Sequence, residues 1–225
     1  CSAGNHAQGV ALAATKNGIK SLICLPDSAP ISKVEATKGY GAEVCLVEGC
    51  YDDAYQKALE FRDREGYTFV HPFDDENVIA GQGTIVLEIL NDLDNIDAIV
   101  VPIGGGGLIS GIAYTVKQIR PSVKVYGVQA AGAPSMYNSV KDGEMECLQG
   151  VSTIADGIAV KRPGDLTYEI VSKYVDDIAT VTEDEICAAI LKLMEKHKLV
   201  TEGAGAVAVA AVMFDKFDLA GKKVV

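Results

Sequence analysis

The sequence alternates short apolar runs with amphipathic segments along its whole length, and this alternation limits the fold more than any other feature. Each apolar run has the length of a buried β-strand, and each amphipathic segment has the length of a helix. Strands that are joined through helices run parallel, because the crossover helix returns the chain to the same end of the sheet. The pattern therefore predicts a parallel α/β protein. The predicted strands are residues 21–25, 43–47, 68–71, 98–103 and 124–129.

The pattern restarts after Pro72, which indicates two domains. We expect a smaller α/β domain over residues 1–74 and part of a larger one over residues 75–225. Residues 142–165 show little periodicity and are predicted to form a long connection, of the kind that often holds functional loops. The helix that opens the second domain is predicted to bury the stripe Val78, Gln82, Ile85 and Ile89.

The last part of the chain carries two helix signals. Thr182 and Glu185 have the spacing of a capping box, so a helix should follow them. A tightly packed Ala/Val-rich helix is predicted from Gly203 to Phe214. Residues 222–225 read as the first half of a strand, and the first residue is not methionine. From these two features we expect the chain to be incomplete at both ends.

Composition excludes several classes of partner. The chain has 20 Lys and Arg against 31 Asp and Glu, a net charge of −11, which disfavours nucleic acids and anionic membranes. Residues 98–116 are uncharged but contain Pro102 and four consecutive glycines, so we expect no membrane span. The 6 cysteines include no C-x-x-C pair and no zinc-like spacing with histidine. They are predicted to be reduced thiols of a cytoplasmic protein.

Gly104–Gly107 follows a predicted buried strand and precedes a predicted helix. Backbone N–H groups in such a loop can surround an anion, and the helix start adds partial positive charge, so we predict a phosphate site. A plain tight turn is the alternative, but four consecutive glycines are more than a turn needs. No P-loop lysine follows, the dinucleotide fingerprint lacks its third glycine, and Gln129 stands where an acidic residue would bind ribose. The loop therefore favours a phosphate-bearing cofactor other than NAD.

A small polar turn, Ser2–Gly9, runs into a predicted helix and is a second candidate anion site. Its N–H, amide and hydroxyl donors suit a carboxylate, although Ser2 or Asn5 could simply cap the helix. His6 could act as a general base, but no partner for that role stands near it in the sequence. Glu202 could equally be a functional carboxylate or a favourable charge in a first helical turn.

Short motifs follow one another along the whole chain, at the start, next to Pro72, around Gln82, at the glycine run, at Thr153–Gly157 and at Glu202–Ala206. In this order they make the sequence resemble the threonine dehydratase and serine racemase branch of the fold-type II pyridoxal-phosphate enzymes. Related cysteine synthases, threonine synthases and tryptophan synthase β-chains carry other residues where this chain has Gly4-Asn5-His6. The resemblance implies two open-twisted parallel-sheet domains of the tryptophan synthase β-like fold. The motifs are residues 2–9, 71–73, 81–84, 104–108, 153–157 and 202–206.

The resemblance also implies pyridoxal 5′-phosphate as the cofactor and a small amino acid as the substrate. Asn5 would hydrogen-bond the 3′-oxygen of the cofactor ring, and Glu202 would lie near the ring. The implied reaction removes the α-proton and the β-hydroxyl of L-threonine and ends in 2-oxobutanoate and ammonia. The substrate carboxylate would be held by Ser2, Ala3, Asn5 and His6. The cofactor phosphate would be held by Gly104, Gly105, Gly106, Gly107 and Leu108.

Two departures from the family pattern narrow the expected chemistry. Racemising members carry a serine at the position of Ala3, and its hydroxyl transfers a proton on the second face of the substrate. Alanine transfers no proton, so dehydration is favoured over racemisation. Racemases also bind a divalent cation through two carboxylates at the positions of Gln129 and Ser135. Neither residue carries a negative charge, so we expect no metal site.

The resemblance places the cofactor-binding lysine before Cys1 and a serine-glycine-glycine motif beyond Val225. We therefore expect residues 1–225 alone to bind pyridoxal phosphate weakly and to release no ammonia from L-threonine. An L-serine dehydratase, a serine racemase and a non-catalytic homologue that binds a phosphate ligand stay open as alternatives. The family further implies a cytoplasmic homodimer or homotetramer in amino-acid metabolism, including isoleucine biosynthesis.

Overall fold

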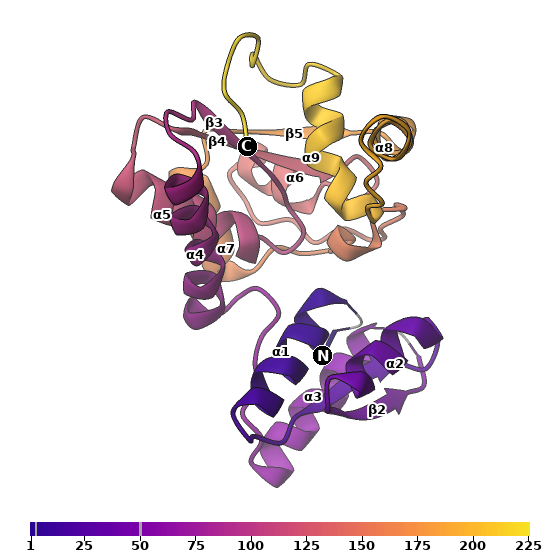
Figure 1. Cartoon of the computed structure of the whole chain (residues 1–225). Coiled ribbons are helices and arrows are strands. Elements are labelled where there is room, and N and C mark those ends of the chain that lie inside the picture. Colours follow the sequence, from indigo (N-terminus) through magenta and orange to yellow (C-terminus); the bar gives the residue numbers. More distant parts are fainter. Residues whose placement is uncertain (3, 50) are drawn as a thin grey trace. The chain divides into compact units, whose positions relative to one another are not determined.

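The computed structural model describes residues 1–2, 4–49 and 51–225, without the side chains of residues 51 and 52. These residues form two compact units, Cys1–Pro72 and Phe73–Val225 (Figure 1). Each unit contains a parallel sheet with helices packed on it, which confirms the α/β class predicted from the apolar runs. Within the described ranges, no helix combines the length and the hydropathy needed to cross a bilayer.

The first unit is built on a two-stranded parallel sheet. β1 (Leu22–Pro26) and β2 (Glu43–Val47) pair along their full length. Ala7 and Ala11 lie one turn apart on the first helix and are fully buried in one apolar cluster with residues of β1. Their small side chains allow the helix to approach the strand closely. The helices of this unit are α1 (Asn5–Lys16), α2 (Ile31–Gly39) and α3 (Tyr51–Glu65).

Residues 68–71 do not form the third strand that the sequence predicts for this unit. A strand exists only through hydrogen bonds to a neighbour, and in the described part of the unit β1 pairs with β2 alone. Val70 O instead accepts a hydrogen bond from His6 Nε2 at 3.2 Å. Phe69 packs edge-on against Tyr55 of α3, with ring centroids 5.5 Å apart. The apolar run is therefore explained by side-chain packing and not by strand pairing.

The second unit contains a three-stranded parallel sheet in the order β3-β4-β5. Val224 adds an isolated parallel bridge to Ala98 on the other edge of β3, as the half-strand predicted at 222–225 suggests. The strands are β3 (Ala98–Pro102), β4 (Lys124–Ala130) and β5 (Asp177–Val181). The helices are α4 (Glu76–Asp92), α5 (Gly107–Ile119), α6 (Ser135–Asp142), α7 (Asp165–Tyr174), α8 (Glu183–Lys192) and α9 (Gly203–Met213). Two short turns of helix are η1 (Asp156–Ile158) and η2 (Leu193–His197).

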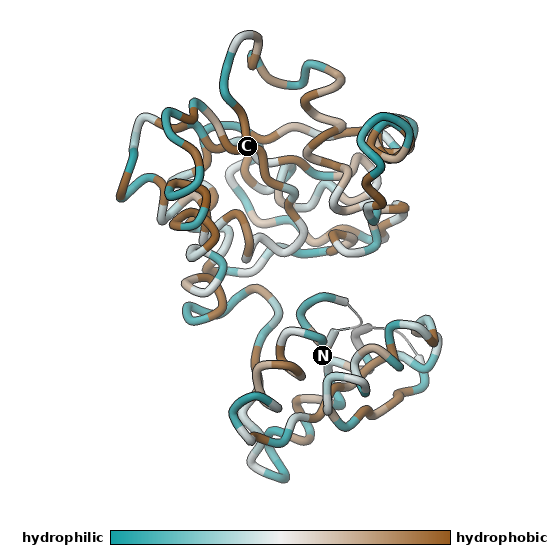
Figure 2. Tube along the Cα trace, in the orientation of Figure 1, coloured by the Kyte–Doolittle hydropathy of each residue, from teal (hydrophilic) through white to brown (hydrophobic). Residues whose placement is uncertain are grey.

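Helices cover both faces of this sheet, and the strand side chains alternate between two apolar cores (Figure 1). Ile99 and Val101 of β3 pack with α4 and α5, whereas Val100 and Val128 pack with α8 and α9. Figure 2 shows hydrophobic residues running through the middle of the unit and hydrophilic residues gathered in its outer loops. Burial on both faces explains why β3 is continuously apolar rather than alternating.

The predicted capping box is confirmed: Thr182 Oγ1 accepts from Glu185 N at 3.3 Å, and Thr182 N donates to Glu185 Oε2 at 2.8 Å. The predicted long connection at 142–165 is also confirmed, since it holds only η1. Sequence reasoning missed β5, α6 and α7. These elements are short, and polar residues interrupt their apolar ones, so none shows a clear periodicity.

α4 buries a different stripe from the predicted one. Ile79, Gly83 and Val86 are buried, whereas Ile85 is 36% exposed. The cause is a close crossing of α4 and α5, at which the backbone of Gly83 meets the backbone of Gly111. A count of apolar side chains gives no weight to glycine, so it misplaces the contact face by one residue. Of the predicted stripe Val78, Gln82, Ile85 and Ile89, Ile89 does pack partly buried against the core, and Ile85 is the exposed residue.

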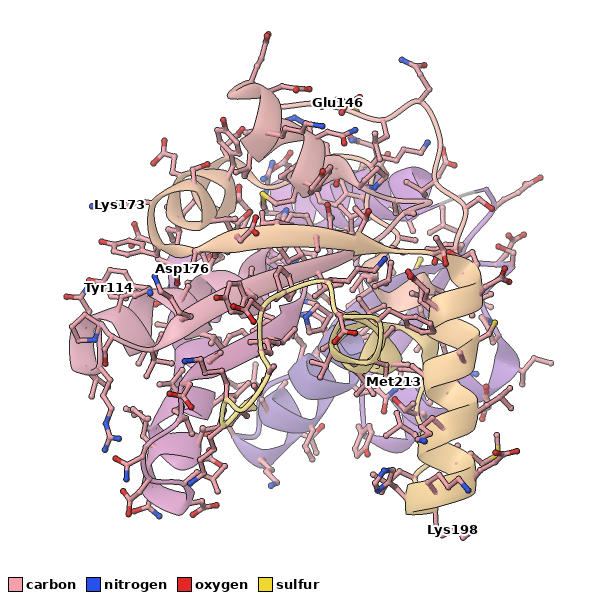
Figure 3. The ribbon with its side chains drawn as sticks, turned by 90° about the horizontal axis from the view of Figure 1, so that it is seen from above. Tyr114, Glu146, Lys173, Asp176, Lys198 and Met213 are labelled. Atoms are coloured by element: carbon pink, nitrogen blue, oxygen red, sulfur yellow. The ribbon has the colours of Figure 1, made fainter. Side chains whose placement is uncertain are left out.

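A polar cluster links α5, β4 and β5 at Asp176, which directly precedes β5 (Figure 3). Its Oδ2 accepts hydrogen bonds from Lys117 Nζ at 2.6 Å and from Val125 N at 2.8 Å, and its Oδ1 accepts from Lys124 Nζ at 2.7 Å. Burial alone would raise the pKa of this carboxyl group. The hydrogen bonds outweigh burial and hold the pKa of Asp176 below its ordinary value.

We expect Asp176→Asn to lower the free energy of unfolding by about 2 kcal/mol near neutral pH, because it weakens charge-assisted hydrogen bonds at a partly buried site. A folded-state pKa below the unfolded value of about 3.9 stabilises the fold above that value, and the contribution is lost as pH falls through the folded pKa. The difference between wild type and variant, measured by denaturant unfolding, should therefore shrink from about pH 7 to about pH 3.

Asp165→Asn is the matched control for this prediction. Asp165 also forms an ion pair, with Arg162 at 2.7 Å, but its side chain is 74% exposed. Solvent screens such a pair, so we expect a loss below about 0.5 kcal/mol. Equal losses from Asp165→Asn and Asp176→Asn would contradict the account of the buried cluster.

Candidate functional site

The glycine run of the second unit connects β3 directly to α5. Gly106 is the N-cap of α5 and has a left-handed backbone, with φ of 101°. Its carbonyl accepts the first hydrogen bond of the helix, from Ser110 N at 2.9 Å. A residue with a side chain is strained in this conformation, so glycine is required at the point where the chain turns from strand to helix.

Phe73 fills the space beside two of the glycines. A Cβ atom at Gly105 would lie 2.5 Å from atoms of the Phe73 ring, and one at Gly107 would lie 2.8 Å from Phe73 Cα. These distances are too short for real Cβ atoms, so neither position accepts a side chain while Phe73 stays in place.

The other two glycines are enclosed by different elements. A Cβ atom at Gly106 would lie 2.7 Å from Met136 Cε and 2.8 Å from Thr167 Cβ. One at Gly104 would lie 3.1 Å from the Cα atom of Ile158 in η1. Each of the four glycines therefore has a close neighbour where its side chain would be. Packing around the loop thus explains why four glycines follow one another.

The enclosed loop leaves backbone donors unused. Among the described residues, no acceptor takes a hydrogen bond from the N–H groups of Gly105, Gly106 and Gly107. These groups precede or begin α5, a helix of 13 residues, so the partial positive charge of the helix start acts at the same place. An anionic group with several oxygens fits this arrangement, because it supplies the missing acceptors. The donor set thus suits a phosphate.

Glu202 lies beside the same part of the second unit. It is the N-cap of α9 and is exposed, and its carbonyl accepts from Ala206 N at 3.2 Å. Its Oε1 lies 3.8 Å from the position of a Cβ on Gly157 in η1. Since η1 also contacts Gly104 through Ile158, it links the glycine loop to the start of α9. Of the two interpretations of Glu202, the position at a helix start is observed, and a role toward a cofactor stays a prediction.

The polar turn of the first unit begins α1, and Ala3 lies outside the described residues. Ser2 Oγ accepts a hydrogen bond from Gly4 N at 3.1 Å, and Gly4 is the N-cap of α1 without a side-chain cap. Ser2 Oγ therefore bonds the N–H of the N-cap residue itself, and the role of this turn toward a carboxylate stays a prediction. Burial lowers the pKa of the His6 imidazole, although the acceptor Val70 O opposes the shift.

Ser2 and His6 line a groove of about 560 Å³ in the first unit, between α1, β1 and residues 67–70. The groove wall is mostly apolar, so the polar atoms of these two residues stand out in it. Asn5 is exposed at the start of α1. The residues predicted to bind a carboxylate lie in the first unit, and those predicted to bind a phosphate lie in the second.

Gln129 and Ser135, the positions compared with metal ligands, are fully buried and take part in internal hydrogen bonds. Gln129 Nε2 donates to Ile103 O at 3.2 Å, and its Oε1 accepts from Tyr137 N at 2.8 Å. Ser135 Oγ donates to Val160 O at 2.9 Å. In the described residues there is no group of three or more His, Cys, Asp or Glu side chains placed to hold a metal ion. The expected lack of a metal stays a prediction.

Sequence reasoning missed the residues that surround the glycine loop. Phe73, Met136 and Thr167 are far from the loop in sequence; Phe73 ends the motif at 71–73 but was given no role there, and Met136 and Thr167 belong to no motif. The one usable signal is Pro163-Gly164-Asp165, which is typical of a helix start and could have predicted α7.

Comparisons with known proteins agree over the whole chain. A family model described as "Pyridoxal-phosphate dependent enzyme" matches residues 1–225. The L-threonine ammonia-lyase of Thermotoga maritima is 55% identical over 223 residues, which are 99% of this chain and 55% of that protein. The chain thus spans about half the length of this relative.

Similar solved structures include a threonine deaminase and a serine racemase. The processed form of threonine deaminase isoform 2 from Solanum lycopersicum aligns with a TM-score of 0.93 and 39% identity, covering 100% of this chain and 66% of that one. Maize serine racemase aligns with a TM-score of 0.93 and 36% identity, covering 99% and 69%.

Proposed function

Because the chain belongs to the pyridoxal-phosphate dependent enzymes, we propose that it is part of a threonine dehydratase, which converts L-threonine to 2-oxobutanoate and ammonia. The expected family, its fold and its cofactor class are confirmed. The activity itself is a proposal, supported by the 55% identity to a threonine ammonia-lyase and by the likeness to threonine deaminase.

The observation that carries the proposal is the glycine loop. Its N–H groups at Gly105, Gly106 and Gly107 have no acceptor among the described residues and stand at the start of α5. We assign them to the cofactor phosphate, together with the backbone of Gly104 and Leu108. A dianionic phosphate supplies the acceptors and the charge that this helix start favours.

When bound, pyridoxal phosphate supplies an electron sink for the charge left on the substrate α-carbon after proton removal. The residues of this chain bind and orient. In this proposal, the turn with Ser2, Ala3, Asn5 and His6 holds the substrate carboxylate, Asn5 holds the 3′-oxygen of the cofactor ring, and Glu202 lies near that ring. The imidazole of His6 already donates through Nε2 to Val70 O, so in this proposal His6 contributes its backbone N–H group to the substrate carboxylate.

The proposal includes the features that the family implies for the whole protein. We propose a cofactor-binding lysine outside these 225 residues, a homodimer or homotetramer, and a cytoplasmic location in amino-acid metabolism such as isoleucine biosynthesis. Cys24, Cys45, Cys147 and Cys187 form no disulfide, as a reducing compartment requires. Cys50 lies outside the described residues.

An assay of the complete protein with L-threonine, L-serine and D-serine tests the proposed function. We expect 2-oxobutanoate and ammonia from L-threonine, with a kcat/KM above that for L-serine, and no interconversion of the serine enantiomers, because alanine at position 3 transfers no proton. Faster deamination of L-serine, or racemisation, would assign the protein to the related activities. Cofactor binding without turnover of any of the three would favour a non-catalytic homologue.

A further inference from the structure

Resting on the proposed function, we propose that Thr167 and Asp74 are positioning residues that direct the phosphate-binding N–H groups of the glycine loop. The side-chain hydroxyl of Thr167 donates to Gly105 O at 2.6 Å and is also 3.2 Å from Gly164 O. Gly164 N donates to the same Gly105 carbonyl at 3.3 Å. Two donors of the α7 start therefore fix this one carbonyl group of the loop.

Fixing the Gly105 carbonyl also fixes the direction of the next N–H group. The carbonyl of Gly105 and the N–H of Gly106 belong to one planar trans peptide, in which they point in opposite directions. With the oxygen held toward Thr167, the Gly106 N–H points away from Thr167. This N–H group is one of those without an acceptor among the described residues. Thr167 thus sets the orientation of a donor without contacting the anion.

Asp74 holds Thr167 in place. Its Oδ1 accepts from Thr167 N and its Oδ2 accepts from Asp165 N, both at 3.1 Å. The N-cap of α7 is Gly164, which has no side chain to cap the helix. Asp74 supplies that cap from 91 residues away in sequence. A Cβ on Gly164 would overlap the Asp74 carboxylate, so the glycine makes room for it.

Burial makes this chain of contacts rigid. Thr167 is fully buried, and its Cβ lies 2.8 Å from the position that a Cβ on Gly106 would take, so no side chain fits between them. Phe73, next to Asp74, fills the space beside Gly105 and Gly107. Phe73 therefore packs directly against the glycine loop, and Asp74 caps α7, the helix whose Thr167 holds the loop. The position of the loop thus depends on this one short segment in two ways.

Thr167→Val and Thr167→Ser in the complete protein test this role. Valine keeps the shape and removes the hydroxyl, whereas serine keeps the hydroxyl. We expect Thr167→Val to raise the Kd for pyridoxal phosphate about tenfold, the cost of misdirecting a donor to a charged group, and to shift the 31P resonance of the bound phosphate. The Kd for pyridoxal, which has no phosphate, should change less than about twofold. Thr167→Ser should behave as wild type.

A second variant keeps the test valid if valine prevents folding. Asp74→Asn retains one acceptor oxygen, so we expect the same selective loss for pyridoxal phosphate, smaller in size. Equal losses for pyridoxal phosphate and pyridoxal, or unchanged binding of both, would overturn the proposal. A wild-type protein that binds pyridoxal phosphate but does not deaminate threonine would overturn the proposed activity and leave this inference standing. A wild-type protein that binds no pyridoxal phosphate would overturn both.

Discussion

Gly111→Ala is expected to lower the free energy of unfolding by about 3 kcal/mol, the upper end of the cost of overpacking a close contact. Gly81→Ala, in the helix that faces Gly111, is expected to raise it by about 1 kcal/mol. The same chemical change, one methyl group on a helical glycine, should thus have opposite effects at two positions of one helix pair.

The structure explains the difference. A Cβ on Gly111 would overlap Ile79 O and would lie 2.6 Å from Gly83 N, both backbone atoms of α4. Backbone in the middle of a helix does not rotate away as a side chain does, so α4 and α5 must separate. At Gly81 nothing lies within 4 Å of the corresponding Cβ position. There alanine only reduces the conformational freedom of the unfolded chain.

Denaturant unfolding of the complete protein measures both changes under the same conditions. Thr115 adds a second check, because its hydroxyl occupies the space beside Gly83. Thr115→Ala should recover little of the stability lost in Gly111→Ala, since backbone atoms and not Thr115 cause the overlap. A stability of Gly111→Ala within experimental error of wild type would show that the two helices do not cross at these glycines.

The close crossing also shows where sequence reasoning stops. The apolar runs predicted β3 and β4 because a strand buried on both faces needs apolar residues throughout, and the sequence displays them directly. The buried face of α4 was missed because its central contact is made by Gly83, a residue with no hydropathy to count. Periodicity identifies a helix, and the shape of its neighbour decides which side is buried.

In the candidate site, too, local sequence predicts one part and misses the contacts between distant segments. Four adjacent glycines after a buried strand predict an anion site from local sequence alone, and three N–H groups of the loop have no acceptor in the described part of the chain. Thr167, Asp74 and Phe73 were not predicted, because each acts through a contact between segments that are distant in sequence. Local patterns indicate what a segment can bind. The residues that hold it in position become visible only in the folded chain.

Gly106→Ala is expected to reduce the affinity of the complete protein for pyridoxal phosphate at least about 100-fold, or about 3 kcal/mol in binding free energy. Alanine in the left-handed conformation costs about 1–2 kcal/mol. Its Cβ would also lie 2.7 Å from Met136 Cε and 2.8 Å from Thr167 Cβ. The loop can relieve the backbone strain and the short contacts only by moving. Such a movement turns its N–H groups away from the position in which they would donate to the phosphate.

Gly143→Ala is the control that separates the effect of left-handed backbone strain from the effect of a displaced glycine loop. Gly143 also has a left-handed backbone, with φ of 73°, but nothing lies within 4 Å of its Cβ position. This variant should therefore lose about 1 kcal/mol of stability through strain and keep its affinity for pyridoxal phosphate. Titration with the cofactor, followed by absorbance, compares the two variants. If both lose affinity equally, the loss at Gly106 reflects general destabilisation, and the glycine loop is not the phosphate site.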